Sequence, residues 1–211
     1  MDKKQSVSAI MLAGGLSQRM GKANKLHLDI DGVPILRRSL EILLNANLGE
    51  IVVVLGHEHR ATSQLIEDLS VRTVYNADYS SGQMTSVHCG LTALEQDCNG
   101  VMVALGDQPA LTVSDINFLI DEYSSRGKAE VIIPSYQGNR GNPIIISEKS
   151  RNDISAGKRK LGCRRFIEDN PELVKMIEMD NPAVIIDLDT PQEFQDYCEN
   201  NKSNYSSSKA S

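Results

Sequence analysis

The sequence predicts a three-layer α/β fold, in which helices cover both faces of a doubly wound, mostly parallel sheet of the Rossmann-like type. Short runs of β-branched and other apolar residues recur with little alternation, as in strands that are buried on both faces. Helical patterns separate most of these runs, and this βαβα order is typical of a parallel sheet with right-handed crossovers. We expect one domain over residues 1–200, because single α/β cores commonly reach this size.

The apolar runs and the helical patterns place the expected elements along the chain. The expected strands cover residues 7–12, 51–55, 71–75, 101–105, 131–134, 142–147, 173–179 and 183–188. The expected helices cover residues 34–46, 58–69, 86–96 and 112–123, and a further helix starts at Thr190. Thr112 with Asp115, and Thr190 with Glu193, have the spacing of a capping box. Residues 201–211 are polar and aperiodic, which predicts a disordered tail.

Composition excludes several classes of protein. The formal net charge of -6 argues against a general nucleic-acid binder, and no apolar stretch approaches the ~20 residues of a membrane span. The four cysteines form no C-x-x-C pair, so we expect reduced thiols and a cytoplasmic location; they are Cys89, Cys98, Cys163 and Cys198. The first forty residues hold seven Lys or Arg against three Asp or Glu, a local charge of +4 that can hold a polyphosphate.

A glycine-rich loop over residues 14–25 follows the first expected strand. Backbone amides in such a loop can bind phosphate oxygens, and Arg19, Lys22 and Lys25 supply positive charge. The loop is not a Walker A motif, because five residues separate the glycine from Gly-Lys and Ala23 follows the lysine. Its spacing does not match G-x-G-x-x-G either. The sequence therefore predicts a phosphate-binding loop of another class.

Further candidates follow other expected strands. Asp107, in the segment LGDQP, is suited to Mg²⁺, which prefers oxygen ligands and usually shares them with phosphates; a turn before proline explains it equally well. In the polar loop over residues 76–87, Thr85 and Ser86 could reach a base or a phosphate, although a serine-capped helix needs no ligand. Asp187 and Asp189 are expected on one strand, and we expect at most one of them to face a site; helix capping is the alternative role for this pair.

Taken in order, these segments resemble a known family. The pattern A-G-G-x-S-x-R-M-G-x-x-x-K is followed by N-x-D-x-x-x-G-x-x-x-S, L-G-D-Q-P, R-G-N-P and D-x-D-T-P-x-E. This order is similar to the MobA-like molybdenum cofactor nucleotidyltransferases, and within them to the cytidylyltransferase branch. The resemblance covers about residues 8–197. The first pattern is shared by many nucleotidyltransferases, whereas the ordered set is far more specific.

The resemblance implies a nucleotidyltransferase fold and an in-line reaction. The terminal phosphate of molybdopterin would attack the α-phosphate of CTP and expel pyrophosphate, with catalysis supplied mainly by positioning and charge neutralisation. The nucleotide-binding half is expected at about residues 7–110 and the acceptor-binding half at about residues 111–197. Transient contact with a molybdenum-dependent oxidoreductase is also expected.

The resemblance also implies roles for individual residues. The expected catalytic residues are Lys25 at the α-phosphate, Arg19 at the β- and γ-phosphates, and Asp107 at Mg²⁺, with Asp187 or Asp189 as a second metal ligand. The expected nucleotide-binding residues are Leu12, Ala13, Gly14, Gly15, Arg19, Lys25, Asn76, Ser86 and Gly106. The expected acceptor-binding residues are Arg140, Gly141, Asn142 and Arg164, with Gly162 nearby.

Three departures from the cytidylyl branch leave alternatives open. The chain has Gly14–Gly15 where A-A-G is usual, and the double glycine is more typical of the guanylyl branch. Asn142 stands where many relatives have histidine, and the G-D-x-G-A-R segment loses its aspartate around Arg164. The alternatives are therefore GMP transfer from GTP to the same cofactor, a nucleotidyltransferase for another small phosphorylated acceptor, and a non-catalytic carrier of finished cofactor.

Overall fold

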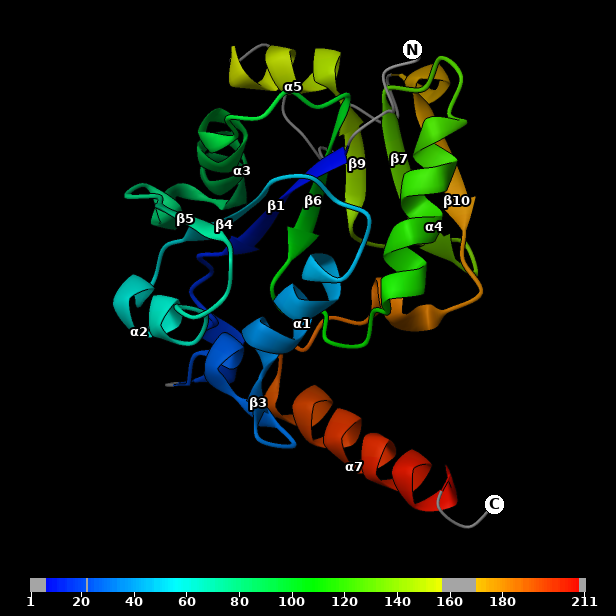
Figure 1. The fold of residues 1–211 in the computed structure, drawn as a ribbon. Helices are drawn as coiled ribbons and strands as arrows, with labels where there is room; N and C mark the ends of the chain where they lie inside the picture. The colour runs from blue at the N-terminus through cyan, green and yellow to red at the C-terminus, as the bar shows by residue number, and fades with distance from the viewer. Residues whose placement is uncertain (1–6, 22, 157–169, 209–211) are drawn as a thin grey trace.

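A mixed sheet forms the centre of the computed structural model, which describes residues 7–21, 23–156 and 170–208 (Figure 1). Its strands lie in the order β10 (Val174–Glu178), β7 (Val131–Tyr136), β9 (Ile144–Ser147), β6 (Gly100–Leu105), β1 (Val7–Ala13), β4 (Ile51–Leu55) and β5 (Arg72–Tyr75). Strand β9 runs antiparallel to β6 and β7, and the other neighbouring pairs in this order are parallel. The predicted mostly parallel sheet is confirmed.

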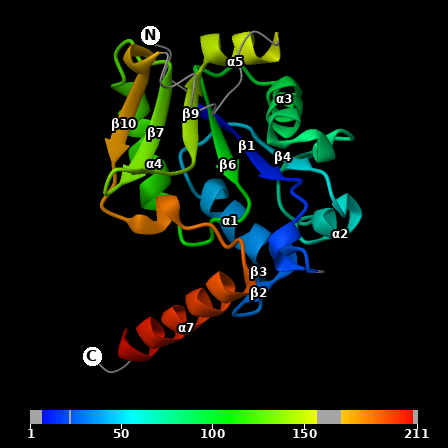
Figure 2. The same ribbon diagram turned by 180° about the vertical axis from the view of Figure 1, so that it is seen from behind.

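Helices cover both faces of this sheet (Figures 1 and 2). On one face, α1 (Ile35–Leu44) and α4 (Val113–Ser124) share a core with Ala9 and Met11 of β1. On the other face, α3 (Gln83–Ala93) and α5 (Glu148–Ser155) pack in a core with Ile10. Neighbouring residues of a strand point to opposite faces, so β1 contributes to both cores. Its uninterrupted apolar sequence follows from burial on both sides.

Shorter elements connect the layers. They are β2 (Asp29–Ile30), β3 (Val33–Pro34), β8 (Asn139–Arg140), α2 (His59–Gln64), and the 3₁₀ turns η1 (Gln18–Met20), η2 (Lys25–His27), η3 (Tyr79–Ser81), η4 (Pro171–Leu173) and η5 (Pro182–Ile185). The predicted helix over residues 58–69 is therefore shorter in the structure. The polar helix α5 was not predicted; the Ser147 hydroxyl caps it by accepting from Ser150 N at 3.1 Å.

One predicted strand is wrong. Residues 183–188 were expected to be extended, but the segment begins with the 3₁₀ turn η5. The side chain of Asn181 accepts a hydrogen bond from Ala183 N at 3.0 Å, and Pro182 occupies the first turn. An asparagine cap followed by proline favours a helical turn over a strand.

The C-terminal helix α7 (Pro191–Ser208) starts where the sequence predicts. Glu193 Oε2 accepts from Thr190 N at 2.8 Å, and Glu193 N donates to Thr190 Oγ1 at 3.2 Å, so the capping box is confirmed. The helix continues through residues 201–208, where a disordered tail was expected. Neither glycine nor proline interrupts this stretch, and α7 leads away from the sheet in both ribbon views (Figures 1 and 2).

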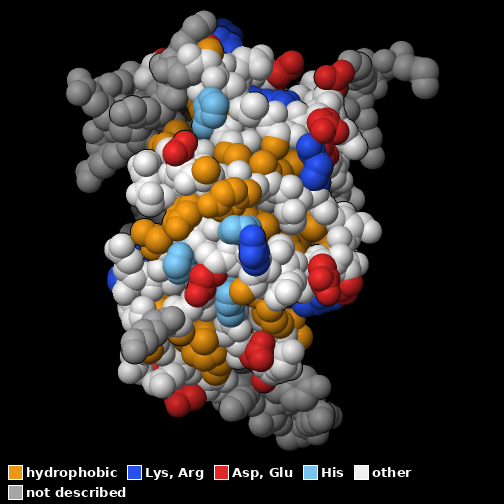
Figure 3. All heavy atoms as spheres, turned by 90° about the vertical axis from the view of Figure 1, so that its left-hand side faces the viewer, with side chains coloured by type: hydrophobic (Ala, Val, Ile, Leu, Met, Phe, Trp, Pro, Cys, Tyr) orange, Lys and Arg blue, Asp and Glu red, His pale blue; other side chains and the backbone are white. Residues whose placement is uncertain are grey.

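Strand β5 leaves one edge of the sheet exposed. Tyr75 of this strand is 48% exposed, and a hollow of about 660 Å³ lies between β5 and α3. Figure 3, which views this side of the molecule, shows hydrophobic side chains gathered in a band. Cys89, which lines the hollow, forms no disulfide within the described residues, and neither do Cys98 and Cys198; Cys163 lies outside the described residues. No helix in the described ranges combines the length and apolar character that crossing a membrane requires.

Gly100 tests how tightly β6 packs against α4. A Cβ at this position would lie 2.5 Å from Cζ of Tyr123, whose ring is completely buried. We expect Gly100→Ala to lower the free energy of unfolding by about 1–3 kcal/mol, the usual cost of overpacking. Gly15→Ala is the matched control, since nothing lies within 4 Å of its Cβ. Urea denaturation of both variants checks this, and equal stabilities would contradict it.

Candidate active site

A cleft of about 790 Å³ opens at the carboxyl ends of β1 and β6. This is where ligands bind in open α/β sheets, and the size suits a small-molecule ligand. Ten of the residues that the sequence predicts for the site line this cleft: Leu12, Gly14, Gly15, Arg19, Lys25, Ser86, Asp107, Asn142, Asp187 and Asp189.

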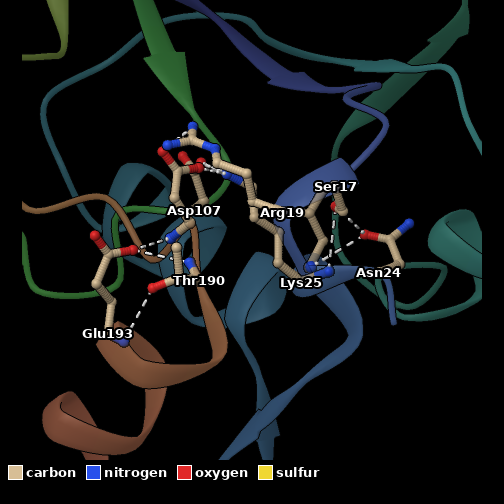
Figure 4. Close-up of polar contacts among 9 residues, drawn as sticks. Ser17, Arg19, Asn24, Lys25, Asp107, Thr190 and Glu193 are labelled. Carbon is tan, nitrogen blue, oxygen red and sulfur yellow. Dashed lines mark hydrogen bonds and ion pairs between the residues drawn. The ribbon is translucent and has the colours of Figure 1, made fainter. Parts of the chain in front are cut away.

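Two cations and two carboxylates meet in the cleft (Figure 4). Lys25 Nζ contacts Asp107 Oδ2 and lies 2.5 Å from Asp189 Oδ1, while the guanidinium of Arg19 contacts Asp189 Oδ2. The Lys25 side chain is 14% exposed, whereas that of Arg19 is 68% exposed. Lys25 is therefore a fixed part of the cleft wall, and Arg19 reaches over it from solvent.

These contacts shift the pKa values of the groups involved. Burial acts to lower the pKa of Lys25, but the charges and hydrogen bonds of Asp107 and Asp189 outweigh it and the net shift is upward. Burial acts to raise the pKa of Asp189, but Lys25 and Arg19 outweigh it and the net shift is downward. Both shifts favour the charged forms, so Lys25 and Asp189 are ionised at neutral pH.

The expectation that at most one of Asp187 and Asp189 faces the site is wrong, because both line the cleft. Residues two apart in an extended segment point the same way, and it is the residue between them, Leu188, that is buried in the core. Asp187 differs from Asp189 in its environment. Burial, followed by the charges of Asp107 and Asp189, raises the pKa of Asp187 to about 6, against a smaller lowering effect of Lys25.

The carboxylates fit a divalent cation that also binds phosphate. Asp107 Oδ1 and Asp187 Oδ1 are buried and have no hydrogen-bond partner in the part of the chain that the structure describes. In those same residues, no group of three or more His, Cys, Asp or Glu side chains could hold a metal by itself. Mg²⁺ is usually bound by one or two carboxylates together with phosphate oxygens and water. The site therefore suits Mg²⁺ that arrives with a polyphosphate.

Hydrogen bonds to backbone carbonyl oxygens bring the aspartates together from distant segments. Leu188 N donates to Asp107 O at 3.3 Å, and Gln108 Nε2 donates to Val184 O at 3.2 Å. Gly106 N donates to Leu12 O at 3.1 Å, and a Cβ on Gly106 would lie 3.0 Å from Leu36 Cδ1. Gly106 and the buried Ala13 thus form structure beneath the cleft and do not line it.

Asn76 shapes the opposite wall without lining it. Its Nδ2 donates to Thr85 Oγ1 and to Ser86 Oγ, both at 2.9 Å, and its Oδ1 accepts from Asp78 N at 3.0 Å. These bonds use both amide hydrogens on protein partners. Ser86 does line the cleft, and because its oxygen accepts from Asn76, its hydroxyl hydrogen can be donated to a ligand.

The predicted acceptor residues lie in different places. Asn142 lines the cleft, and its backbone N donates to Val184 O at 2.8 Å. Gly141 is packed so closely that a Cβ would lie 2.3 Å from the same carbonyl oxygen. Arg140 is exposed on β8 and is not among the lining residues. Arg164 and Gly162 lie outside the described residues.

Sequence reasoning missed part of the lining. The additional lining residues are Leu16, Ser17, Gln18, Leu26, Tyr79, Ser80, Gly82, Gln83 and Leu105. Almost all of them lie in, or next to, the glycine-rich loop and the loop over residues 76–87. Both loops were identified as candidates, so their position after strands was a sufficient signal; which side chains turn inward depends on the turns η1 and η3.

Asp187→Asn tests the electrostatic strain in the cleft, in metal-free protein with EDTA. A native pKa of about 6 against an ordinary 3.8 means that the folded state binds the extra proton between these values, so wild-type stability falls as pH rises from about 4 to 6. A shift of one pKa unit corresponds to ~1.4 kcal/mol, and solvent screening reduces this for a partly exposed group. We therefore expect Asp187→Asn to raise the free energy of unfolding by on the order of 1 kcal/mol above pH 6. Asp180→Asn, at an exposed position, is the control. Parallel stability curves for Asp187→Asn and wild type would contradict this account.

Comparison with known proteins agrees with the geometry. A family model described as the MobA-like NTP transferase domain matches residues 9–175. Nicotine blue oxidoreductase of Paenarthrobacter nicotinovorans is 29% identical over 89% of this chain and 94% of its own length. Molybdenum cofactor cytidylyltransferase of Escherichia coli K12 is 27% identical over 90% of this chain and 94% of its own length.

Solved structures share the fold. Rv0371c from Mycobacterium tuberculosis H37Rv superposes with a TM-score of 0.81 at 21% identity, over 94% of this chain and 100% of its own. The same protein in complex with manganese gives a TM-score of 0.76 at 18% identity, over 92% and 98% of the two chains. The family model covers most of the sequence, and we conclude that the chain belongs to the MobA-like NTP transferase family and is an enzyme of the nucleotidyltransferase type.

Proposed function

We propose that this enzyme transfers CMP from CTP to the terminal phosphate of molybdopterin and releases pyrophosphate. The observation that carries the proposal is the juxtaposition of Lys25 with Asp107 and Asp189 inside a cleft at the strand ends. The fixed ammonium group can bind a triphosphate, and the carboxylate oxygens without hydrogen-bond partners can bind the cation that accompanies it.

The proposed step is an in-line displacement. An oxygen of the acceptor phosphate forms a bond to the α-phosphorus, the bond from that phosphorus to the bridging β-oxygen breaks, and pyrophosphate leaves with the electron pair. Lys25 would offset negative charge at the α-phosphate, and the exposed Arg19 would hold the β- and γ-phosphates. Both side chains would exchange contacts with Asp189 for contacts with phosphate oxygens.

Asp107 and Asp187 would hold Mg²⁺ through their unpartnered oxygens, with Asp189 adjacent. When bound, the cation would neutralise phosphate charge and orient the triphosphate. The complex of the similarly folded Rv0371c with manganese supports a divalent cation in this fold. Asp189, freed from Arg19, would balance the combined charge of Lys25 and the metal.

One contact removes an argument for guanosine, and one hydrogen-bond donor favours cytidine. A Cβ on Gly14 would lie 3.1 Å from Gly56 N, so the unusual Gly14 is explained by its packing against the loop after β4 and does not itself indicate guanine. The Ser86 hydroxyl can donate into the cleft. Cytosine presents two ring-edge acceptors, N3 and O2, to such a donor, whereas the pairing edge of guanine presents one, O6.

The acceptor is proposed to bind at Asn142, which lines the cleft and whose backbone N donates to Val184 O, in the segment that leads to Asp187 and Asp189. An amide at this position can donate to a phosphate or to a pterin carbonyl. Two alternatives fit the same site: GMP transfer from GTP to molybdopterin, which changes the nucleotide, and nucleotidyl transfer to another small phosphorylated acceptor. A non-catalytic carrier is disfavoured, since Arg19, Lys25 and Asp107 are all present in the cleft.

A thermal-shift comparison of CTP, GTP and ATP with Mg²⁺ tests the nucleotide. At 100 times its dissociation constant a ligand stabilises the fold by about 2.7 kcal/mol, which for a chain of this size raises Tm by roughly 5–10 °C. We expect the largest shift with CTP, and a smaller one when EDTA replaces Mg²⁺. A larger shift with GTP would overturn the cytidylyl assignment, and no shift with any triphosphate would overturn nucleotidyl transfer.

Asp107→Asn tests the metal and charge arrangement. The substitution keeps the shape of the side chain but weakens both the contact with Lys25 and the metal ligand, so we expect kcat/KM to fall at least ~100-fold. The measurement is release of pyrophosphate from CTP with molybdopterin, with the exposed Asp180→Asn as control. Normal turnover by a folded Asp107→Asn protein would show that the carboxylate has no such role.

A further inference from the structure

The buried Asn24 joins the two ends of the glycine-rich loop just before Lys25. Only 7% of this residue is exposed. Its Oδ1 accepts from Leu26 N at 3.1 Å, which caps the turn η2, and lies 3.4 Å from Ser17 Oγ at the start of the loop. Ser17 Oγ in turn accepts from Lys25 N at 3.3 Å (Figure 4). Asn24 thus fixes the backbone that carries Lys25, although it does not line the cleft.

Glu58, from the loop after β4, orients the Asn24 amide. Its Oε2 accepts from Asn24 Nδ2 at 3.1 Å, a charge-assisted bond that sets which end of the amide faces Leu26 N. Its carbonyl oxygen accepts from Thr62 N at 3.0 Å and from Thr62 Oγ1 at 3.1 Å, so the start of α2 holds Glu58 in place. Thr62 Oγ1 also lies 2.9 Å from His27 Nε2 of η2, a second tie between the turn and α2.

Backbone conformation marks both ends of this network. Ser17 has φ of 49° and Glu58 has φ of 50°, values in the left-handed region that residues other than glycine rarely adopt. Each costs free energy and persists only where surrounding contacts enforce it. The two residues that contact Asn24 through their side chains, Ser17 and Glu58, thus both have a strained backbone. This indicates that the surrounding contacts fix the position of the glycine-rich loop.

We propose that Asn24 and Glu58 are positioning residues that hold Lys25 in register with the reacting phosphate. The inference rests on the proposed function of Lys25 and assigns a role to two residues that do not line the cleft. A lysine side chain is long and flexible, so a fixed backbone reduces the freedom that the transition state must remove. Loss of the network should therefore lower kcat more than it weakens nucleotide binding.

The test compares three variants, Glu58→Ala, Glu58→Gln and Asn24→Ala. The control is Glu67→Ala, because Glu67 is an exposed glutamate in the turn that follows α2. We expect kcat to fall about 10- to 100-fold in Glu58→Ala and Asn24→Ala, with the Kd for CTP changing less than about threefold. Glu58→Gln keeps an oxygen that accepts from Asn24, so it should retain most of the activity. A purely structural role would not produce this split between kcat and Kd or this rescue.

A second readout does not depend on turnover. The rate at which acetic anhydride modifies Lys25, followed by mass spectrometry, should rise in Glu58→Ala relative to the other lysines and stay at the wild-type value in Glu67→Ala. Unchanged kcat and unchanged Lys25 modification in Glu58→Ala would overturn the inference, even if Asn24→Ala failed to fold. If Lys25→Met turned over like wild type, the proposed function would fail instead, and the modification rates would still decide whether Glu58 holds the lysine.

Discussion

The contact of Lys25 with Asp107 and Asp189 is the interaction on which the rest of the cleft depends. Three aspartates converge there, and like charges at short range oppose one another's ionisation. Burial, together with the charges of Asp107 and Asp189, raises the pKa of Asp187, whereas Lys25 and Arg19 outweigh burial at Asp189 and lower its pKa. The lysine therefore allows a concentration of negative charge that a cation-binding site requires.

The sheet explains how these groups meet. Strands β1 and β6 are neighbours and parallel, so the glycine-rich loop and the LGDQP segment leave the sheet at the same edge. The antiparallel β9 lies between β6 and β7, and the chain that precedes it brings Asn142 to the same edge. The backbone N of Asn142 and the side-chain Nε2 of Gln108 both donate to the carbonyl oxygen of Val184, and these two bonds attach the segment that carries Asp187 and Asp189. One carbonyl oxygen thus connects the two halves of the cleft.

The sequence was sufficient to predict the elements whose residue types are dictated by burial. Strands buried on both faces need uninterrupted apolar residues, so β1, β4 and β6 were found with bounds correct to one residue. It was insufficient where polar side chains set the backbone, as at η5, where Asn181 and Pro182 form a turn in an apolar stretch, and at α5, which is mostly polar. Among site residues, Lys25 and Asp107 could be predicted because they lie within recognisable loops. The bond between Asn24 and Glu58 could not, since it joins positions that are distant in sequence and carry no pattern of their own.

The capping of α7 also affects the cleft, although this helix lies at the end of the described chain. Glu193 Oε2 accepts from Asp189 N at 2.9 Å as well as from Thr190 N, so the first turn of α7 fixes the backbone of the aspartate that contacts Lys25 and Arg19 (Figure 4). The amino end of a helix also carries partial positive charge, which stabilises a nearby carboxylate. Shortening the chain before residue 193 would thus alter charge balance in the cleft without removing any residue that lines it. A helix that leads away from the body is, through its first turn, part of the site.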